Sequence, residues 1–408
     1  MKKRTVTPQP IDPIDGAANT QLTGTVTMSS GPPHSPPSRF FPALESTRGI
    51  AALMVAAYHI NVTPSGVVQH AYLIADESSS FWYSLHLVYR VICNGAGAVV
   101  YFFVLSGFVL TISLSEQKSS IIKSFIEFAA RRAIRLYSVN IAATMMFFAV
   151  SFLVADYVNV FHVPSITKLV GNLLLLRTDI LGLTWTLQVE VIAIPLVFGI
   201  AMLGYRYGIG LPAVVTILLI ALSFGPRMGG LLSDGTIVRH LFCFAIGCLV
   251  ALAREPITKW IAGQRAAPIL VLCTIGFFAA RPLLGYASQW SFVFEALFGA
   301  AIIGILAYGP ALSARRALET PLPRFVGRVS FSFYLLHPLP LFAIYSLPPM
   351  IETGLPGLVV AFGLFVGSTV VTLPLAWLTW RLVEVPSTRL GRRFSGSEHP
   401  ATKAAPHR

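Results

Sequence analysis

Long apolar segments separated by short polar ones set the main constraint on this chain. Several of them run for about 20 residues without a charged side chain, which is the length that a helix needs to cross a hydrocarbon core about 30 Å thick. Only helices and closed barrels satisfy the backbone inside a bilayer, and continuous rather than alternating apolar runs favour helices. We therefore predict an all-α fold, a polytopic transmembrane helix bundle of about ten helices. The ten predicted segments are 46–63, 94–114, 136–157, 183–205, 208–224, 237–253, 266–281, 289–312, 329–348 and 356–380.

The charge balance supports this interpretation. The chain has 408 residues, of which 55% are hydrophobic and only 12% charged, about half the charge of a soluble domain. An excess of 30 Lys and Arg over 17 Asp and Glu could indicate nucleic acid. Most of the basic residues, however, lie in short segments on one side of the predicted membrane, as in cytoplasmic loops. The pattern predicts that both termini are cytoplasmic and that no nucleic acid binds. The basic residues expected outside are Arg90, Lys168, Arg177, Arg227, Arg239 and Arg281.

The two ends of the chain differ in composition from the apolar middle. Residues 1–39 are rich in Pro, Ser, Thr and Gly, and residues 394–408 are similar, so we expect disordered cytoplasmic tails around a transmembrane domain at 40–393. The four cysteines form no C-x-x-C pair. We therefore predict neither a disulfide framework nor a metal site.

The first apolar segment carries ionisable side chains on one helical face. At 100° per residue, Glu45, Arg48 and His59 fall within about 80° of one another, and Arg48 and His59 are about 16 Å apart along the axis. An ionisable group at bilayer depth costs from roughly 2.5 kcal/mol upward and suggests function. Two interpretations stay open here. Arg48 could snorkel to the cytoplasmic interface while His59 bonds a neighbouring helix, or one long ligand could contact both.

Two arginines precede the third predicted segment. Arg132 and Arg135 are three residues apart and share a helical face. At the inner start of a helix they could bind phosphate, because guanidinium groups and free N–H groups both favour it. The alternative is an ordinary positive anchor at the cytoplasmic side.

Two residues stand out at the predicted outer start of the fourth segment, Trp185 and Glu190. Glu190 should lie about 10 Å below the outer surface, near the depth of His59. Its carboxylate could orient an imidazole, bind a sugar hydroxyl or bond a neighbouring helix.

Polar residues elsewhere fit structural roles better. His337 lies in the ninth segment, and Glu384, at the inner end of the tenth, could pair with Arg381. We interpret Ser106 and Gly107 as small residues at a close helix contact.

Taken in order, these motifs resemble those of acyltransferase family 3, the integral-membrane O-acyltransferases. The matching residues are Phe41-Pro42-Ala43-Leu44-Glu45-Ser46-Thr47-Arg48-Gly49 with Tyr58-His59, the stretch 97–110, Arg132 with Arg135, Trp185-Thr186-Leu187 with Glu190, the stretch 327–337, and Val383-Glu384 with Pro386. There are two departures: Val191 stands where many members carry a second Glu, and Val385 replaces the usual Arg.

The resemblance implies a reaction and roles for the singled-out residues. The donor would be acyl-CoA, usually acetyl-CoA, and the acceptor a hydroxyl of a carbohydrate or other natural product. Arg48, Arg132 and Arg135 would hold the anionic head of coenzyme A at the inner interface, and its arm would extend toward His59. His59 would act as general base, and Glu190 would position His59 or the acceptor. Substrate contacts are expected from Glu45, Trp185 and His337.

Three functions remain open at this stage. The leading one is acylation of a cell-surface or exported polysaccharide by an enzyme of the bacterial inner membrane. The acceptor could instead be a small cytoplasmic natural product or a lipid-linked sugar. A transporter is the alternative from another class, although we see no internal repeat of the kind that transporters often show. The sequence identifies neither the acceptor, the acyl chain length nor the oligomeric state.

Overall fold

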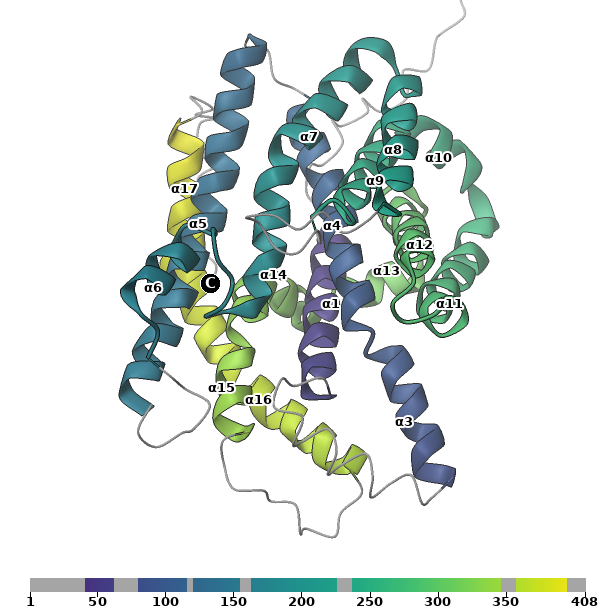
Figure 1. The fold of residues 1–408 in the computed structure, drawn as a ribbon. Helices are drawn as coiled ribbons and strands as arrows, with labels where there is room; N and C mark the ends of the chain where they lie inside the picture. The colour runs from purple at the N-terminus through teal and green to yellow at the C-terminus, as the bar shows by residue number, and fades with distance from the viewer. Residues whose placement is uncertain are drawn as a thin grey trace, which may run out of the picture. The chain divides into compact units, whose positions relative to one another are not determined.

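The computed structural model describes residues 41–61, 80–115, 120–154, 163–225, 237–345 and 357–394, and within these ranges all regular structure is helical (Figure 1). The predicted tails, 1–39 and 394–408, lie outside the described residues except for Phe394. Each of the ten predicted apolar segments overlaps at least one helix. The helices are α1 Pro42–Asn61, α3 Ser80–Ile92, α4 Gly95–Leu114, α5 Ile121–Val154, α6 Ile166–Leu173, α7 Trp185–Tyr207, α8 Gly210–Ser223, α9 Leu241–Leu252, α10 Arg254–Trp260, α11 Ala266–Leu284, α12 Gln289–Tyr308, α13 Ser313–Leu318, α14 Pro321–Leu336, α15 Pro338–Tyr345, α16 Gly357–Thr379 and α17 Val385–Phe394.

Several of these helices are suited to a membrane. In the described ranges six helical stretches are long and apolar enough to cross one, and a seventh is added if α9 and α10, bent by 72°, form one span. This indicates a multi-pass membrane protein. The predicted count of ten helices and the cytoplasmic placement of both ends stay predictions. Helix α1 falls outside the six, since Glu45, Arg48 and His59 interrupt its apolar sequence, and α8 has only 14 residues.

Helices α1 and α14 pack against each other in parallel. Arg48 bonds Ser330 near one end of the contact, and His59 bonds His337 near the other, so residue numbers rise in the same direction along both helices. If both helices span the membrane, they cross it in the same direction. The number of crossings from α1 to the last helix before α14, with α1 included, is then even. This parity agrees with α14 as the ninth helix, although it does not fix the count.

Glycines allow two of the closest helix contacts. A Cβ atom on Gly49 would lie 2.6 Å from the backbone nitrogen of Gly327, where α1 meets α14. Between α4 and α9, a Cβ on Gly107 would lie 2.1 Å from the carbonyl oxygen of Phe244. Small residues let helix backbones approach in this way inside membranes. The interpretation of Gly107 as a close-packing residue is confirmed.

The described part of the segment before α7 is folded into the bundle. Lys168 and Arg177 of this segment were expected on the outer side, and Asn172, Leu175 and Leu181 within it are each at most 3% exposed. Asn140 of α5 donates to the backbone oxygens of Asn172 (3.0 Å) and Leu173 (3.2 Å), which satisfies carbonyls that would otherwise be costly to bury. The backbone that leads into α7 is therefore packed against α5.

Candidate active site

Arg48 is held at the contact between α1 and α14 by neutral groups. Its Nε donates to Ser330 Oγ (2.8 Å), and its Nη2 donates to the carbonyl oxygen of Gly327 (3.1 Å). Ser330 Oγ itself donates to Gly327 O (2.7 Å). Among the described residues no carboxylate lies within 4.0 Å of the Arg48 guanidinium group. The positive charge is thus fixed in place and left without an ion-pair partner in this part of the chain.

Arg132 lies well inside α5, which corrects its expected position at a helix start. Since α5 begins at Ile121, Arg132 is about 16 Å along the axis, and the argument from free N–H groups at a helix N-terminus is wrong. Residues 121–135 contain no helix breaker, and Lys123 and Glu127 form an i,i+4 pair (4.0 Å), so the helix includes the charged residues that precede the predicted segment 136–157. Arg132 donates to Ser106 Oγ (2.8 Å) and forms an ion pair with Glu190.

Glu190 is therefore placed against α5 rather than against His59. Glu190 forms its ion pair with Arg132 and lines the same cavity as Arg48. Its expected depth of about 10 Å below the outer surface stays a prediction.

Arg135 pairs with a residue from the far end of the sequence. Its Nη2 donates to Glu384 Oε1 (2.8 Å), and Ser332 Oγ donates to Glu384 Oε2 (3.2 Å). The sequence suggested that Glu384 could pair with Arg381, but its partner is Arg135. A π-helical turn, Trp380–Glu384, joins α16 to α17 and lets Glu384 face α5, while the Arg381 guanidinium lies over the ring of Trp377.

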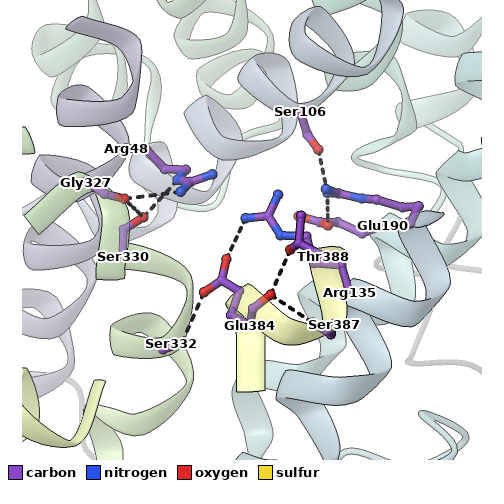
Figure 2. A network of polar contacts seen from close by, with 11 residues as sticks. Arg48, Ser106, Arg135, Glu190, Gly327, Ser330, Ser332, Glu384, Ser387 and Thr388 are labelled. Atoms are coloured by element: carbon purple, nitrogen blue, oxygen red, sulfur yellow. Dashed lines mark hydrogen bonds and ion pairs between the residues drawn. The ribbon is translucent and has the colours of Figure 1, made fainter. Parts of the chain in front are cut away.

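These groups surround a cavity of about 250 Å³. Figure 2 shows the side chains of Arg48 and Arg135 approaching one another from opposite sides. Two buried polar atoms in the lining, Glu45 Oε2 and Arg132 Nε, have no hydrogen-bond partner among the described residues. Such atoms are uncommon in native structures and here indicate room for a polar ligand. The charged lining residues are Glu45, Arg48, Arg132, Arg135 and Glu190.

His59 and His337 form a second group, beyond one wall of the cavity. His337 Nε2 lies 3.1 Å from His59 Nδ1, and the two rings are 5.1 Å apart at 37°. Neither histidine is among the described residues that line the cavity. Tyr334 does line it, and its hydroxyl accepts a hydrogen bond from Thr186 Oγ1 (3.2 Å). Tyr334 thus lies between the two groups, since its carbonyl oxygen contacts His337 (2.7 Å).

Trp185 is placed apart from both groups. Its ring packs edge-on against the ring of Phe103, with the ring centroids 6.1 Å apart, and lies tilted against the ring of His240, with the centroids 5.3 Å apart. Among the described lining residues Trp185 does not occur, whereas its neighbours Thr186 and Leu187 do. The expected substrate contact of Trp185 stays a prediction.

Three polar residues of this site were not expected from the sequence. Ser106 was interpreted only as a packing residue, yet it accepts a hydrogen bond from Arg132 and lines the cavity. Ser330 and Ser332 were given no role, although they bond Arg48 and Glu384. Their spacing of two residues on a helix was a usable signal, because it directs two hydroxyls to different neighbours.

The family comparison covers both groups of residues. A family model described as an acyltransferase domain matches residues 41–381. The chain belongs to acyltransferase family 3. The match includes α1 with Arg48 and His59, the arginine pair of α5, and α14 with His337. Comparison with curated proteins and comparison with solved structures returned no match. As a member of acyltransferase family 3 with several membrane-crossing helices, the protein is a membrane acyltransferase.

Proposed function

We propose that this acyltransferase family 3 protein moves an acyl group from acyl-CoA to a hydroxyl of a carbohydrate. Acetyl-CoA is the first donor to test, and a cell-surface or exported polysaccharide in bacteria is the acceptor class. The bilayer is the third partner, since α5 and α7, which carry Arg132, Arg135 and Glu190, are long and apolar enough to cross it.

The observation that carries the proposal is the charge state of the cavity. Arg132 and Arg135 each have a carboxylate partner, whereas Arg48 is bonded only to neutral oxygens among the described residues. Arg48 also faces Arg135 (Figure 2), and two like charges held face to face favour an anion between them. Guanidinium groups match the oxygens of phosphate. The phosphates of coenzyme A supply such an anion.

The distance from this cavity to the histidines suits a long, neutral arm. Arg48 and His59 lie on one unbroken helix, α1, so about 16 Å separates them along the axis. The cavity of about 250 Å³ is smaller than the 300–1,000 Å³ usual for drug-sized ligands. It therefore accommodates one segment of the donor, and the acyl end passes Tyr334 to reach His59.

The reaction that follows is a direct transfer. His59 takes the proton of the acceptor hydroxyl as its oxygen attacks the carbonyl carbon of the thioester. The carbon–sulfur bond then breaks, and the thiolate of coenzyme A takes the proton from His59. An ester and free coenzyme A are the products, and His59 returns to its starting state.

Purified protein in lipid nanodiscs would test this directly. With radiolabelled acetyl-CoA and a polysaccharide acceptor, we expect one free coenzyme A for each ester formed. In His59→Ala, checked for insertion and folding, the rate should fall by about 10²–10⁴-fold. Unchanged ester formation would remove His59 from the mechanism, and movement of label across the bilayer without an ester would support a transporter instead.

The acceptor can be separated from its alternatives in the same preparation. Mass spectrometry of surface glycans from cells with and without the protein should show the loss of an acetyl ester. If the glycans are unchanged but a small soluble acceptor is acylated from the cytoplasmic face, the natural-product alternative holds.

A further inference from the structure

We propose that His337 is a positioning residue that, together with the carbonyl oxygen of Val55, holds the proton of His59 on Nδ1 and so directs the lone pair of His59 Nε2 to the acceptor hydroxyl. This assignment rests on the proposed function for its chemistry. The tautomers of both rings, however, follow from their contacts with backbone carbonyl groups and can be tested without any substrate.

The local sequence after α14 creates the first of these contacts. In a continuing helix the N–H of residue 338 would bond the carbonyl oxygen of Tyr334, but Pro338 has no N–H. The side chain of His337 contacts this carbonyl instead, with Nδ1 at 2.7 Å from Tyr334 O. The backbone N–H of His337 bonds Phe333 O (3.0 Å), so the residue is anchored on two sides at the end of α14.

This contact fixes where His337 carries its proton. A carbonyl oxygen can only accept a hydrogen bond, so His337 Nδ1 must be the donor. In the neutral ring Nε2 then has a lone pair and accepts. His337 is 1% exposed, and its ring plane makes an angle of 18° with the ring plane of Phe333. This packing restricts the rotation of the His337 ring.

The same reasoning assigns the proton of His59. His59 Nδ1 lies 2.9 Å from the carbonyl oxygen of Val55 and 3.1 Å from His337 Nε2. Both of these atoms accept, so Nδ1 is protonated and shares its hydrogen between them. The lone pair of the neutral His59 ring therefore lies on Nε2, the nitrogen that turns away from His337.

The arrangement has a consequence during the reaction. When Nε2 takes the proton of the hydroxyl, His59 becomes a cation, and its Nδ1–H still points at the lone pair of His337 and at Val55 O. Both acceptors stabilise the cation without any movement of the chain. His337 itself neither gains nor loses a proton, and the thiolate of the leaving coenzyme A takes the proton from Nε2.

Two substitutions separate positioning from simple packing. The amide oxygen of His337→Gln reaches about the place of Nε2, so it keeps an acceptor for His59. The shorter His337→Asn reaches about the place of Nδ1, so it keeps the bond to Tyr334 O and loses the one to His59. We expect kcat to fall by less than about 10-fold in His337→Gln and by about 100-fold in His337→Asn, with both KM values within about threefold.

The opposite order would overturn the proposal. If His337→Asn is the more active variant, His337 serves to close the end of α14. Equal activities of both variants and the wild type would show that His337 plays no part in the reaction.

Nitrogen NMR of the full chain in nanodiscs, labelled with ¹⁵N-histidine, tests the tautomers themselves. His59 should show a protonated Nδ1 and an unprotonated Nε2 in the wild type, and His59→Gln identifies its signals. His337→Asn removes one of the two acceptors of His59 Nδ1, so the share of His59 protonated on Nδ1 should fall, while Val55 O still favours that tautomer. A wild-type His59 protonated on Nε2 would refute the assignment even if the enzyme is active. If acetyl-CoA is not used but the tautomers are as described, the proposed function fails and the geometry stands.

Discussion

Arginine and glutamate meet inside this protein in two different settings. In one of them, Arg281 of α11 binds both carboxylate oxygens of Glu295 on α12, at 2.9 and 2.7 Å. Asn94 at the start of α4 donates to Glu295 Oε1 (2.6 Å), and Arg281 Nη1 donates to Tyr286 O (2.6 Å). Arg281 is 6% exposed and Glu295 0%. Every charged atom pairs here, and three helices are joined.

The cavity between α1, α4, α5, α7 and α14 is built from the same residue types with less complete pairing. Glu190 and Glu384 each bond one arginine, Arg48 has only neutral partners among the described residues, and Glu45 Oε2 has none there. The comparison teaches that a buried ion pair does not by itself mark a site. Charged groups that lack a partner and face a cavity do mark a site, because a ligand is then needed to complete their pairing.

The largest effect on stability should come from breaking the complete pair. Glu295→Gln leaves Arg281 buried without its countercharge, which should destabilise the fold by about 3–5 kcal/mol. Unfolding in mixed detergent micelles measures this. The double variant Arg281→Met with Glu295→Leu should recover most of the loss, since no charge is left buried. If the single variant is as stable as the wild type, the cluster is not structural and the comparison fails.

Removing the charge of Arg48 should affect binding far more than stability. In Arg48→Met, Ser330 Oγ keeps its bond to Gly327 O, so we expect less than about 1 kcal/mol of destabilisation. Hydrogen bonds to charged groups contribute about 1.5–3 kcal/mol, so KM for acetyl-CoA should rise by about 10–150-fold. Arg177→Met is the matched control, because Arg177 lies in an exposed pair with Asp179 (3.1 Å). A large loss of stability with unchanged KM would make Arg48 a structural residue.

The smallest effect is expected from Glu384→Gln. The amide still accepts a hydrogen bond from Arg135, but one negative charge leaves the surroundings of the cavity. An anionic donor should then bind more tightly, with KM for acetyl-CoA lower by about two- to tenfold. Steady-state kinetics at several salt concentrations measures the change, which should shrink as salt screens the charges. A higher KM would instead show that Glu384 is needed to hold Arg135 in place.

The sequence by itself determined where the apolar helices lie and which polar residues depart from them. Each predicted segment overlaps a helix, because a run of about 20 apolar residues has few other stable states in a membrane. The distance between Arg48 and His59 along the helix axis was also predictable, because both residues lie in α1 and the rise per residue of an α-helix is fixed. The family followed from the order of the motifs.

Only the tertiary structure decided which of these residues meet. Glu190 pairs with Arg132 because α7 packs against α5, and Asn140 of α5 also bonds the backbone that precedes α7. Glu384 meets Arg135 across 249 positions of the chain because a π-helical turn redirects it. His337 reaches His59 across 278 positions because α1 and α14 pack closely at Gly49 and Gly327. Helical periodicity acts over a few residues, whereas these pairs depend on how whole helices cross, and a single sequence does not encode that locally.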